Sequence, residues 1–444
     1  MAVFAPPLLR AAGSIGPPHA FAFVPRPPPR PVRRLRVRRL VLANSSPENI
    51  ARAPTWAETL KGAVFWSRPK NWDQRPRSWY STLAFMLFKW VGTIGGYRGR
   101  ANFARAKGLQ ALDQARGAAA AAVDATAAAA EDAEHFQSVA KRVAGAGPSD
   151  APCLAVVLPA FARSAADVAE LFATLRALWR QTRRPDVVIV VDDASPADLT
   201  PALKAWQDED NLAHVRMSAN TGPAGARSVG MRLLRRWGQS RGRRIVACFT
   251  DSDAAPETAW CEAMMSAQRA FPGIVCGPTL SKDTSLIGQF HDHFGNLNGR
   301  WTWDDLPAVV LYGCTVNWSA DLGRLGDLEF DPVFRRPGFE DIELCWRARK
   351  ERRVLTRYCE GARVKHEYDR GLVGLYRQFW KYGNTEPIMA FLHPDFTFQN
   401  SRPVVSGFQD PRLEALQASI PAGSEQAAAK AIGKLRELFK MPEA

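Results

Sequence analysis

The sequence IVACFTDSDAAP, residues 245–256, decides the fold prediction for this chain. It begins with a continuous apolar run, which is typical of a strand buried on both faces of a sheet. The run gives way at once to Thr250, Asp251, Ser252 and Asp253. Two carboxylates spaced two residues apart on an extended backbone project to the same side and repel each other. A divalent cation that also binds phosphate oxygens would remove that repulsion, although an isolated pair of this kind is more often a plain acidic turn.

Segments typical of strands and of helices alternate around this stretch. Apolar runs predict strands at 153–161, 187–191 and 214–217, and helical spacing predicts helices at 166–179, 201–207 and 225–237. The alternation predicts an α/β domain with a mostly parallel central sheet flanked by helices. Ligands of such sheets bind beyond the carboxyl ends of the strands, so the polar residues that follow each strand should converge.

Polar clusters do follow the predicted strands. The first two strands end in Pro159-Ala160-Phe161 and in Asp192-Asp193, and a glycine-containing loop, NTGPAGAR at 220–227, precedes a helix. Backbone amides in such a loop can approach an anion, and a helix N-terminus favours negative charge. A further cluster, PGFEDIELCWR at 337–347, is followed by a strand-like segment that ends in His366. Each cluster alone could be no more than a turn or a helix cap.

Taken together, these segments resemble the inverting nucleotide-sugar glycosyltransferases of family 2, which have the GT-A fold. The order and spacing of the family's motifs are matched between Cys153 and Pro394. The matching segments are PAF at 159–161, VVDDAS at 190–195, NTGPAGAR at 220–227, DSD at 251–253, FEDIELCWR at 339–347 and His366.

The resemblance implies a role for each matching residue. Asp251, Asp253 and His366 would bind Mn²⁺ or Mg²⁺ on the diphosphate, and Asp341 would be the general base, with Glu340 beside it. The acceptor would contact Asn317 and Glu343, and either Glu340 or Glu343 would orient it. Independently of the resemblance, Trp303 is a further candidate for the acceptor site because its ring could stack on a sugar, although a buried core aromatic is an equal alternative. Asp193 would bind the base of the nucleotide, and Arg227 would lie near the base or the diphosphate. The expected nucleotide-sugar site as a whole comprises Pro159, Phe161, Asp192, Asp193, Asn220, Gly222, Arg227 and Asp251.

The chemistry of sugar transfer agrees with these roles. Displacing a nucleoside diphosphate from an anomeric carbon builds negative charge on the leaving phosphate, which a cation stabilises. The acceptor hydroxyl loses its proton as it attacks, and a carboxylate can take that proton. The expected donor is a UDP-sugar, and the expected acceptor is a glycan, a lipid-linked molecule or a small molecule.

The sequence leaves two alternative functions to consider. A sugar nucleotidyltransferase would need a glycine-rich loop with a lysine near the first strand, and residues 159–164 lack one. A non-catalytic carbohydrate-binding protein of the same fold would be expected to have lost an acid, but all of the acids are present.

Residues 1–47 contain eight arginines and no acidic residue, whereas the whole chain has a formal charge of +15. Removing those arginines leaves 51 basic against 44 acidic residues (59 − 8 = 51). The positive charge therefore belongs mostly to the N-terminus, and a nucleic-acid partner is not expected. The composition predicts a transit peptide for a plastid or mitochondrion, with an uncleaved disordered tail as the alternative.

The remaining predicted regions are a Trp-rich segment with an Ala-rich helical linker at 48–150, a GT-A domain at 151–395 and a tail with one helix at 396–444. The apolar stretch 83–88 is too short to span a bilayer. We expect it to pack on the main domain or to lie at a membrane interface, which makes peripheral membrane contact a further expectation. Residues 375–392 read as an amphipathic helix that packs on the domain or contacts a lipid-linked acceptor. Seven cysteines without a C-x-x-C pair predict free thiols.

Overall fold

The computed structural model describes residues 52–72, 76, 78–106, 108–131, 139, 151–204, 206, 211–295, 297, 301–303, 309–368, 371–393, 396 and 401–403. These residues all belong to one compact unit, Asn44–Ala444. The predicted transit peptide at 1–47 and the predicted tail helix at 425–439 lie outside the described residues.

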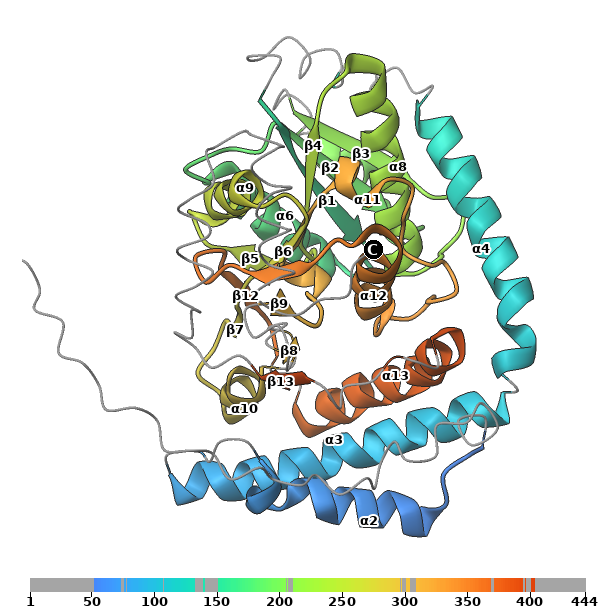
Figure 1. Cartoon of the computed structure of the whole chain (residues 1–444), viewed down its shortest axis with the longest axis vertical. Coiled ribbons are helices and arrows are strands. Elements are labelled where there is room, and N and C mark those ends of the chain that lie inside the picture. Colours follow the sequence, from blue (N-terminus) through green and yellow to red (C-terminus); the bar gives the residue numbers. More distant parts are fainter. Residues whose placement is uncertain are drawn as a thin grey trace, which may run out of the picture. The chain divides into compact units, whose positions relative to one another are not determined.

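The core of the unit is a mixed sheet whose strand order is β13-β8-β9-β11-β6-β10-β4-β1-β2-β3 (Figure 1). The strands β1, β2, β3 and β4 pair in parallel, while β10 lies antiparallel between β4 and β6. Every residue of β2 and β4 is buried, because helices cover both faces of the sheet. The strand bounds are β1 Cys153–Ala160, β2 Val187–Asp192, β3 Leu212–Arg216, β4 Ile245–Phe249, β6 Ile274–Cys276, β8 Trp301–Trp303, β9 Val309–Val310, β10 Trp318–Asp321, β11 Thr356–Tyr358 and β13 Ser401–Pro403.

The connections between the strands place helices on both faces of the sheet. The chain moves outward from β1 through β2 to β3, then crosses back to β4. Because such crossovers are right-handed, α6 (Ala165–Trp179) and α8 (Pro223–Arg241) must cover opposite faces. Figure 1 shows α8 on one side of the parallel strands and α6 with α9 (Trp260–Ala270) on the other. The predicted α/β class with its flanked central sheet is therefore confirmed.

Several predicted elements differ from the structure in their bounds; for example, the helix predicted at 225–237 is α8, Pro223–Arg241. The third strand is Leu212–Arg216 rather than 214–217, because it pairs with β2 from Leu212 onward. The short helix α7 spans Thr200–Lys204 rather than 201–207.

A second, three-stranded sheet has the order β5-β12-β7. Its strands are β5 Ala254–Pro256, β12 Val364–His366 and β7 Thr279–Ser281. The register sets His366 opposite Ala254 on one side and opposite Ser281 on the other. This pairing brings the end of β12 to the residue that follows Asp253.

The N-terminal helices join the main domain through a second apolar core. This core contains Trp72, Phe85, Phe88, Ile287, Phe290, Tyr368 and Leu375. It lies between α3 (Trp79–Arg105), α10 (Leu286–Phe294) and α13 (Gly371–Leu392). Glycines bring α3 very close to α13: a Cβ at Gly95 would lie 2.5 Å from the Tyr376 carbonyl oxygen. The Arg100 Nε also donates to Glu386 at 2.7 Å, so α3 is fixed to α13 along its length.

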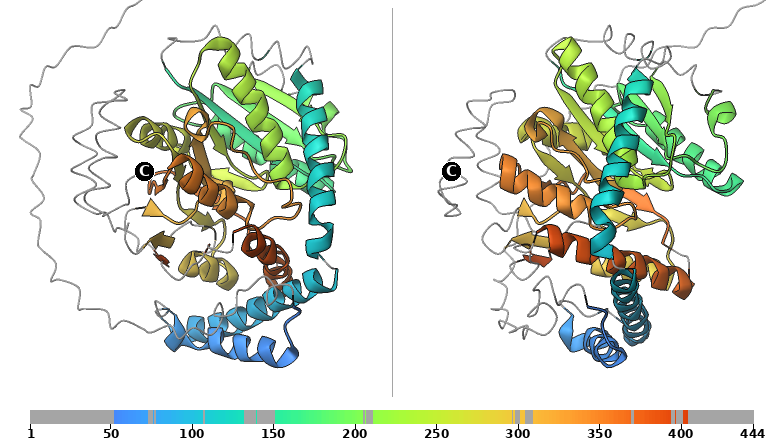
Figure 2. Two further views of the ribbon diagram at one scale, coloured as in Figure 1. Left: turned by 45° about the vertical axis from the view of Figure 1, so that its right-hand side comes forward. Right: turned by 90° about the vertical axis from the view of Figure 1, so that its right-hand side faces the viewer.

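The Ala-rich segment is not merely the linker that we expected. It forms α4 (Gly108–Glu131), which runs along α8 (Figures 1 and 2). Leu112, Ala119, Val123, Ala127 and Ala130 recur at helical spacing and are buried. The small alanine side chains let α4 and α8 approach closely, so the two helices pack together without large apolar residues on α4. The Arg116 guanidinium also pairs with Asp331 at 2.6 Å.

In the described part of the chain, no helix is both long enough and apolar enough to cross a membrane. All seven cysteines are free thiols, as predicted, and six of them are buried.

Candidate active site

The loops after β1, β2 and β4 lie at the carboxyl edge of the parallel strands and carry most of the predicted donor-site residues. Pro159 is the penultimate residue of β1, and Phe161 follows that strand and is 41% exposed. Asp193 follows β2, where Ala194 adopts a positive φ of 55°. The positive φ turns the chain sharply away from the sheet, a conformation that non-glycine residues rarely adopt.

Asp193 holds the glycine-containing loop against the end of β2. Its two carboxylate oxygens accept hydrogen bonds from the amides of Thr221 at 2.7 Å and Gly222 at 2.9 Å, and its backbone carbonyl accepts from Asn220. Burial raises the pKa of Asp193 to about 6, against the effect of these hydrogen bonds. The predicted nucleotide residues Asp193, Asn220 and Gly222 are therefore in mutual contact.

Only glycine fits the backbone conformation and the space at position 222. Its φ is +84°, and a Cβ there would lie 2.1 Å from the carbonyl oxygen of Arg335. Pro223 follows at the first position of α8, where its fixed φ suits a helix start and its missing N–H costs nothing. The loop can therefore lie against the segment before α12 (Glu340–Arg352), and the Arg335 guanidinium donates to the Asn220 carbonyl at 3.1 Å.

Asp192 has a different environment from that expected of a nucleotide ligand. Its side chain is fully buried, accepts from the Ser195 amide at 2.8 Å and pairs with the Arg216 guanidinium of β3. A carboxylate used in this way stabilises the turn after β2. We therefore reassign Asp192 from the nucleotide-sugar site to the structural support of that site.

Arg227 connects the two groups of predicted acids. It lies on the first turns of α8 and is almost fully buried. Its Nη2 donates to Asp251 at 2.8 Å, and its Nη1 donates to Glu340 at 3.0 Å. The acids after β4 and the acids of α12 (Glu340–Arg352) are thus brought to the two sides of one guanidinium. A buried arginine with two carboxylate partners has the pairing that a buried charge requires.

Asp251, Asp253 and His366 form the only group of potential metal ligands within the described ranges. One ligand atom from each lies within 4.8 Å of the others, and the His366 Nε2 is 3.3 Å from Asp253 Oδ1. Burial alone would lower the pKa of His366, but the charges of Asp253 and Asp251 raise it. Two carboxylates and one imidazole are a donor set that suits Mn²⁺ well, and the carboxylates suit Mg²⁺.

Lys282 also reaches this group of ligands, although no sequence motif pointed to it. Its Nζ donates to the carbonyl oxygen of Asp253 at 2.5 Å. The strand register explains its position, because Lys282 directly follows Ser281, which lies opposite His366. Its amide also donates to the His366 carbonyl at 3.0 Å. Knowledge of the β7–β12 pairing would have been needed to predict a cation here.

Asp341 stands at the N-terminus of α12 after a tight turn. Gly338 has a φ of +126° and Phe339 a φ of +69°, so the chain reverses immediately before Glu340. Asp341 is partly buried and accepts from the amides of Thr315 at 3.3 Å and Ile342 at 2.8 Å. It makes no ion pair with the described residues. Burial, and then the negative charge of Glu340, raise the pKa of Asp341 to about 7.

Two residues that we expected to contact the acceptor are used elsewhere. Glu343 is buried, pairs with Arg347, and lies 3.0 Å from the His393 Nε2. The Asn317 side chain is also buried: it accepts from the Trp260 indole and donates to the carbonyls of Pro278 and Ala362. All of these partners are internal, so we assign both residues to the structure of the domain.

Glu340 and Trp303 complete the predicted residues. Glu340 is buried and accepts from the Gly338 amide at 2.6 Å as well as from Arg227. These contacts make it a partner of Arg227 rather than a group that orients the acceptor. Trp303 lies in β8, but its side chain is outside the described part of the structure.

His291 and His293 lie on α10, and Asp292 lies between them in the sequence. The His291 ring stacks on Tyr368 with centroids 4.3 Å apart, and burial lowers its pKa to about 3. This stacking fixes α10 beside His366, because Tyr368 is two residues beyond that histidine.

Comparison with known proteins gives one family match. Residues 155–306 match the model of the family described as glycosyl transferase family 2. The match covers the strand ends through Asp253 but stops before Asp341 and His366, so the positions of those two residues depend on the structure. No curated protein sequence matches the chain.

Two proteins are among the solved structures that the chain is similar to. TarS of S. aureus is 14% identical over 65% of this chain and 49% of its own, with a TM-score of 0.36. This chain thus spans about half the length of TarS. Mannosyltransferase PcManGT from Pyrobaculum calidifontis, in complex with GDP-Man and Mn²⁺, is 19% identical over 74% of this chain and 95% of its own, with a TM-score of 0.35. A shorter TarS, residues 1–349 in complex with UDP, is 15% identical over 64% of this chain and 85% of its own, with a TM-score of 0.34.

Proposed function

We propose that this glycosyltransferase, which contains a glycosyl transferase family 2 domain over residues 155–306, transfers a sugar from a nucleotide-diphosphate sugar to an acceptor hydroxyl with inversion at the anomeric carbon. The transfer is metal-assisted, and Asp341 is the general base. The donor is a UDP-sugar, and the acceptor is a glycan, a lipid-linked molecule or a small molecule.

The observation that carries this proposal is the double contact of Arg227. One guanidinium joins Asp251, in the group of potential metal ligands, to Glu340, the neighbour of Asp341. A donor diphosphate at the metal ligands would therefore have Asp341 within reach on the other side of Arg227. Sugar transfer by a single displacement requires this arrangement: a leaving group stabilised on one side and a base on the other.

Asp341 has properties that suit a base for a hydroxyl proton. Its pKa of about 7 lies near the pH of most compartments, which is where a general base works best. The amides of Thr315 and Ile342 fix the direction of its carboxylate. Among the described residues it makes no ion pair, although the charge of Arg227 still acts on it, so a proton taken from the acceptor would not have to displace a bound cation. Glu340, which pairs with Arg227, contributes by raising the pKa of Asp341.

The residues around Asp253 fit a divalent cation. Asp251, Asp253 and His366 would hold it, and when bound it would neutralise charge on the departing diphosphate. The ammonium of Lys282 adds a positive charge beside the same ligands. On the other side of the strand ends, Asp193 and the loop at 220–222 would bind the nucleotide base and ribose, with Pro159 and Phe161 as further contacts.

The test of the proposal is product formation by the purified full chain. It is incubated with UDP-sugars and GDP-sugars, with and without Mn²⁺, and the nucleoside diphosphate released is measured. We expect release from at least one donor that depends on Mn²⁺ and is lost in Asp341→Asn, and an anomeric configuration opposite to the donor's by NMR of the product. Metal-independent release, or retention of configuration, would contradict the mechanism. Binding of a nucleotide sugar without any turnover would instead favour a non-catalytic binding protein.

For localisation, we propose import into a plastid or mitochondrion directed by residues 1–47, which are rich in arginine and free of acids. A fluorescent protein fused behind residues 1–47 should enter one of these organelles. Diffuse cytosolic fluorescence would refute this proposal and would support an uncleaved basic tail.

A further inference from the structure

Exposed apolar side chains are concentrated on two helices of the N-terminal region. Twelve large hydrophobic side chains are exposed in the described part of the chain. Eight of them lie on α2 (Trp56–Ser67) or α3. Those eight are Trp56, Leu60, Val64, Trp79, Tyr80, Leu83, Leu87 and Trp90. Scattered exposed apolar residues are normal on a soluble protein, whereas a gathering on two neighbouring helices marks an interaction surface.

The apolar residues of α3 form a stripe on one side of the helix. Trp79, Leu83, Leu87 and Trp90 recur every three or four residues, which places them on one face. The opposite face carries Phe85, Phe88 and the glycines that pack on α10 and α13. The side chains that α3 contributes to the second apolar core thus come from this opposite face. This stripe is not needed for the described core, and its most exposed member, Trp79, is 75% accessible.

The same region is strongly basic. Between residues 52 and 106 the sequence has ten lysines and arginines but only two acids, Glu58 and Asp73. Lys61 lies on α2, Lys70 lies on the short helix η1 (Pro69–Asn71) that follows it, and Arg68 is the residue between the two helices. The Arg98 guanidinium lies over the Trp56 ring, 4.9 Å from its centroid, so cationic and aromatic groups are also in direct contact.

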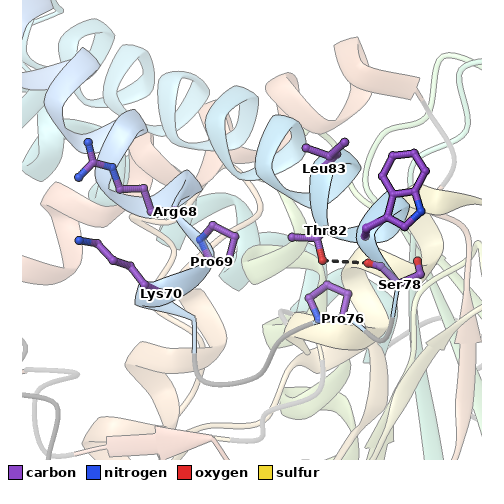
Figure 3. A pocket seen from close by; sticks show the side chains of 8 residues that line it. Arg68, Pro69, Lys70, Pro76, Ser78, Thr82 and Leu83 are labelled. Atoms are coloured by element: carbon purple, nitrogen blue, oxygen red, sulfur yellow. Dashed lines mark hydrogen bonds between the residues drawn. The ribbon is translucent and has the colours of Figure 1, made fainter.

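A shallow pocket of about 900 Å³ brings these two kinds of residue together. Figure 3 shows Arg68 and Lys70 on one wall, and Thr82 and Leu83 on the other. Trp79 also lines the pocket. Two cations beside a tryptophan and a leucine are the groups that bind a phosphate headgroup and its first acyl carbons at a bilayer surface.

We propose that α2, η1 and the exposed face of α3 form a surface that docks on a bilayer containing anionic phospholipid. The helices lie in the plane of the interface, with Trp79, Leu83 and Leu87 inserted and Arg68 and Lys70 on the headgroup phosphates. The charge selects this occupant. The Arg-rich segment 1–47 would be repelled by the basic residues of this surface, and so would the same surface of a second copy.

This surface is connected to the proposed active site by direct packing. The inner face of α3 contacts α13, and Tyr382 and Thr385 of α13 lie against Gly338 in the turn before Glu340. A bilayer under α3 would therefore be next to the helix that borders the proposed base. The docking proposal does not depend on the proposed function, because it rests on residues outside the active site.

The test is partition of the purified full chain onto vesicles. The chain is mixed with phosphatidylcholine vesicles or with vesicles containing about 30% phosphatidylglycerol, and the bound fraction is measured by flotation. We expect binding to the anionic vesicles that weakens as salt is raised. The variants Trp79→Ser/Leu83→Ser/Leu87→Ser and Arg68→Glu/Lys70→Glu should each lower the partition coefficient tenfold or more.

Matched controls separate the surface from general effects of charge and apolarity. Arg241→Glu/Arg269→Glu makes the same charge change on α8 and α9, and Phe391→Ser removes an exposed apolar side chain from α13. Both should bind the vesicles like the unmodified chain. Absence of binding to anionic vesicles would overturn the proposal, as would equal losses in the controls. So would a dimer that is abolished by the triple serine variant, because a second copy would then be the occupant.

Discussion

The carboxylates on the two sides of Arg227 lie in opposite electrostatic surroundings. On the side of β4, Asp253 lies beside His366 and the Lys282 ammonium, so negative charge is gathered next to cationic groups. On the side of α12, the Asp341 carboxylate accepts hydrogen bonds from the backbone amides of Thr315 and Ile342, and burial with the charge of Glu340 raises its pKa to about 7 against the opposing effect of Arg227. The difference teaches that the residue type alone does not define a role: one set of acids is placed beside cationic groups, and the other acid has the raised pKa that the proposed base requires.

The strongest test of this comparison is Asp341→Asn. The amide keeps the size of the side chain but cannot take a proton, so we expect kcat to fall by about 10²–10⁴. Donor binding, measured by calorimetry, should stay within about twofold, because the proposed metal ligands are untouched. Asp327→Asn, which changes an exposed acid, is the control and should leave kcat unchanged. A variant that keeps most of its activity would show that the base is another group.

Arg227→Met would break the connection between the two sides. It leaves Glu340 buried without its partner, and we expect a loss of about 3–5 kcal/mol in the free energy of unfolding, measured with urea. The double variant Arg227→Met/Glu340→Gln should recover part of that stability, because no unpaired charge stays buried. If the single and double variants are equally stable, the pair does not matter for folding.

Asp253→Asn would weaken the side that gathers charge. We expect the affinity for Mn²⁺, measured by electron paramagnetic resonance, to fall by about 100-fold, because a neutral amide is a poorer ligand than a carboxylate. Asp283→Asn changes a nearby acid that accepts from the Ser285 amide just before α10, and this variant should bind Mn²⁺ normally. Equal affinity in both variants would exclude Asp253 as a ligand.

The pH profile would sharpen the other side. A base must be unprotonated to accept a proton, so kcat should fall as pH drops below the pKa of Asp341. With a pKa of about 7, the loss approaches tenfold for each unit of pH below it. A profile that stays flat down to pH 5 would contradict the raised pKa.

Lys282→Met should have the smallest effect. Removing one positive charge near the metal ligands should raise the KM for the donor by about three- to tenfold and leave kcat nearly unchanged. Lys365→Met removes an exposed lysine beside His366 and serves as the control. If both variants behave alike, the effect is one of general charge.

Several features could be predicted from the sequence because they depend on short-range patterns. The strand Ile245–Phe249 has the predicted bounds, since a short apolar run that ends abruptly in acids is typical of a buried strand. The turn at 337–339 could be expected from Pro-Gly, and α12 from its acidic first turn and basic last turn.

Other features depended on pairing partners that the sequence does not reveal. Asn317 and Glu343 have the residue types of a binding site, but their partners are buried carbonyls, an arginine and a histidine. Lys282 reaches Asp253 only through the register of β7 with β12. The alanines of α4 carry no large apolar face, so the packing of α4 on α8 could not be seen from hydrophobic periodicity.

The second apolar core has a consequence for any attempt to study the sugar-transferring part alone. Phe85 and Phe88 cover Phe290, whose neighbour His291 stacks on Tyr368. A shortened protein that began at residue 151 would uncover those rings and the side of α13 that packs against the glycines of α3. It would expose an apolar surface that favours aggregation, and α10, which lies beside the strand that ends in His366, would lose its packing against α3. The N-terminal helices are therefore an integral part of the fold that carries the proposed active site.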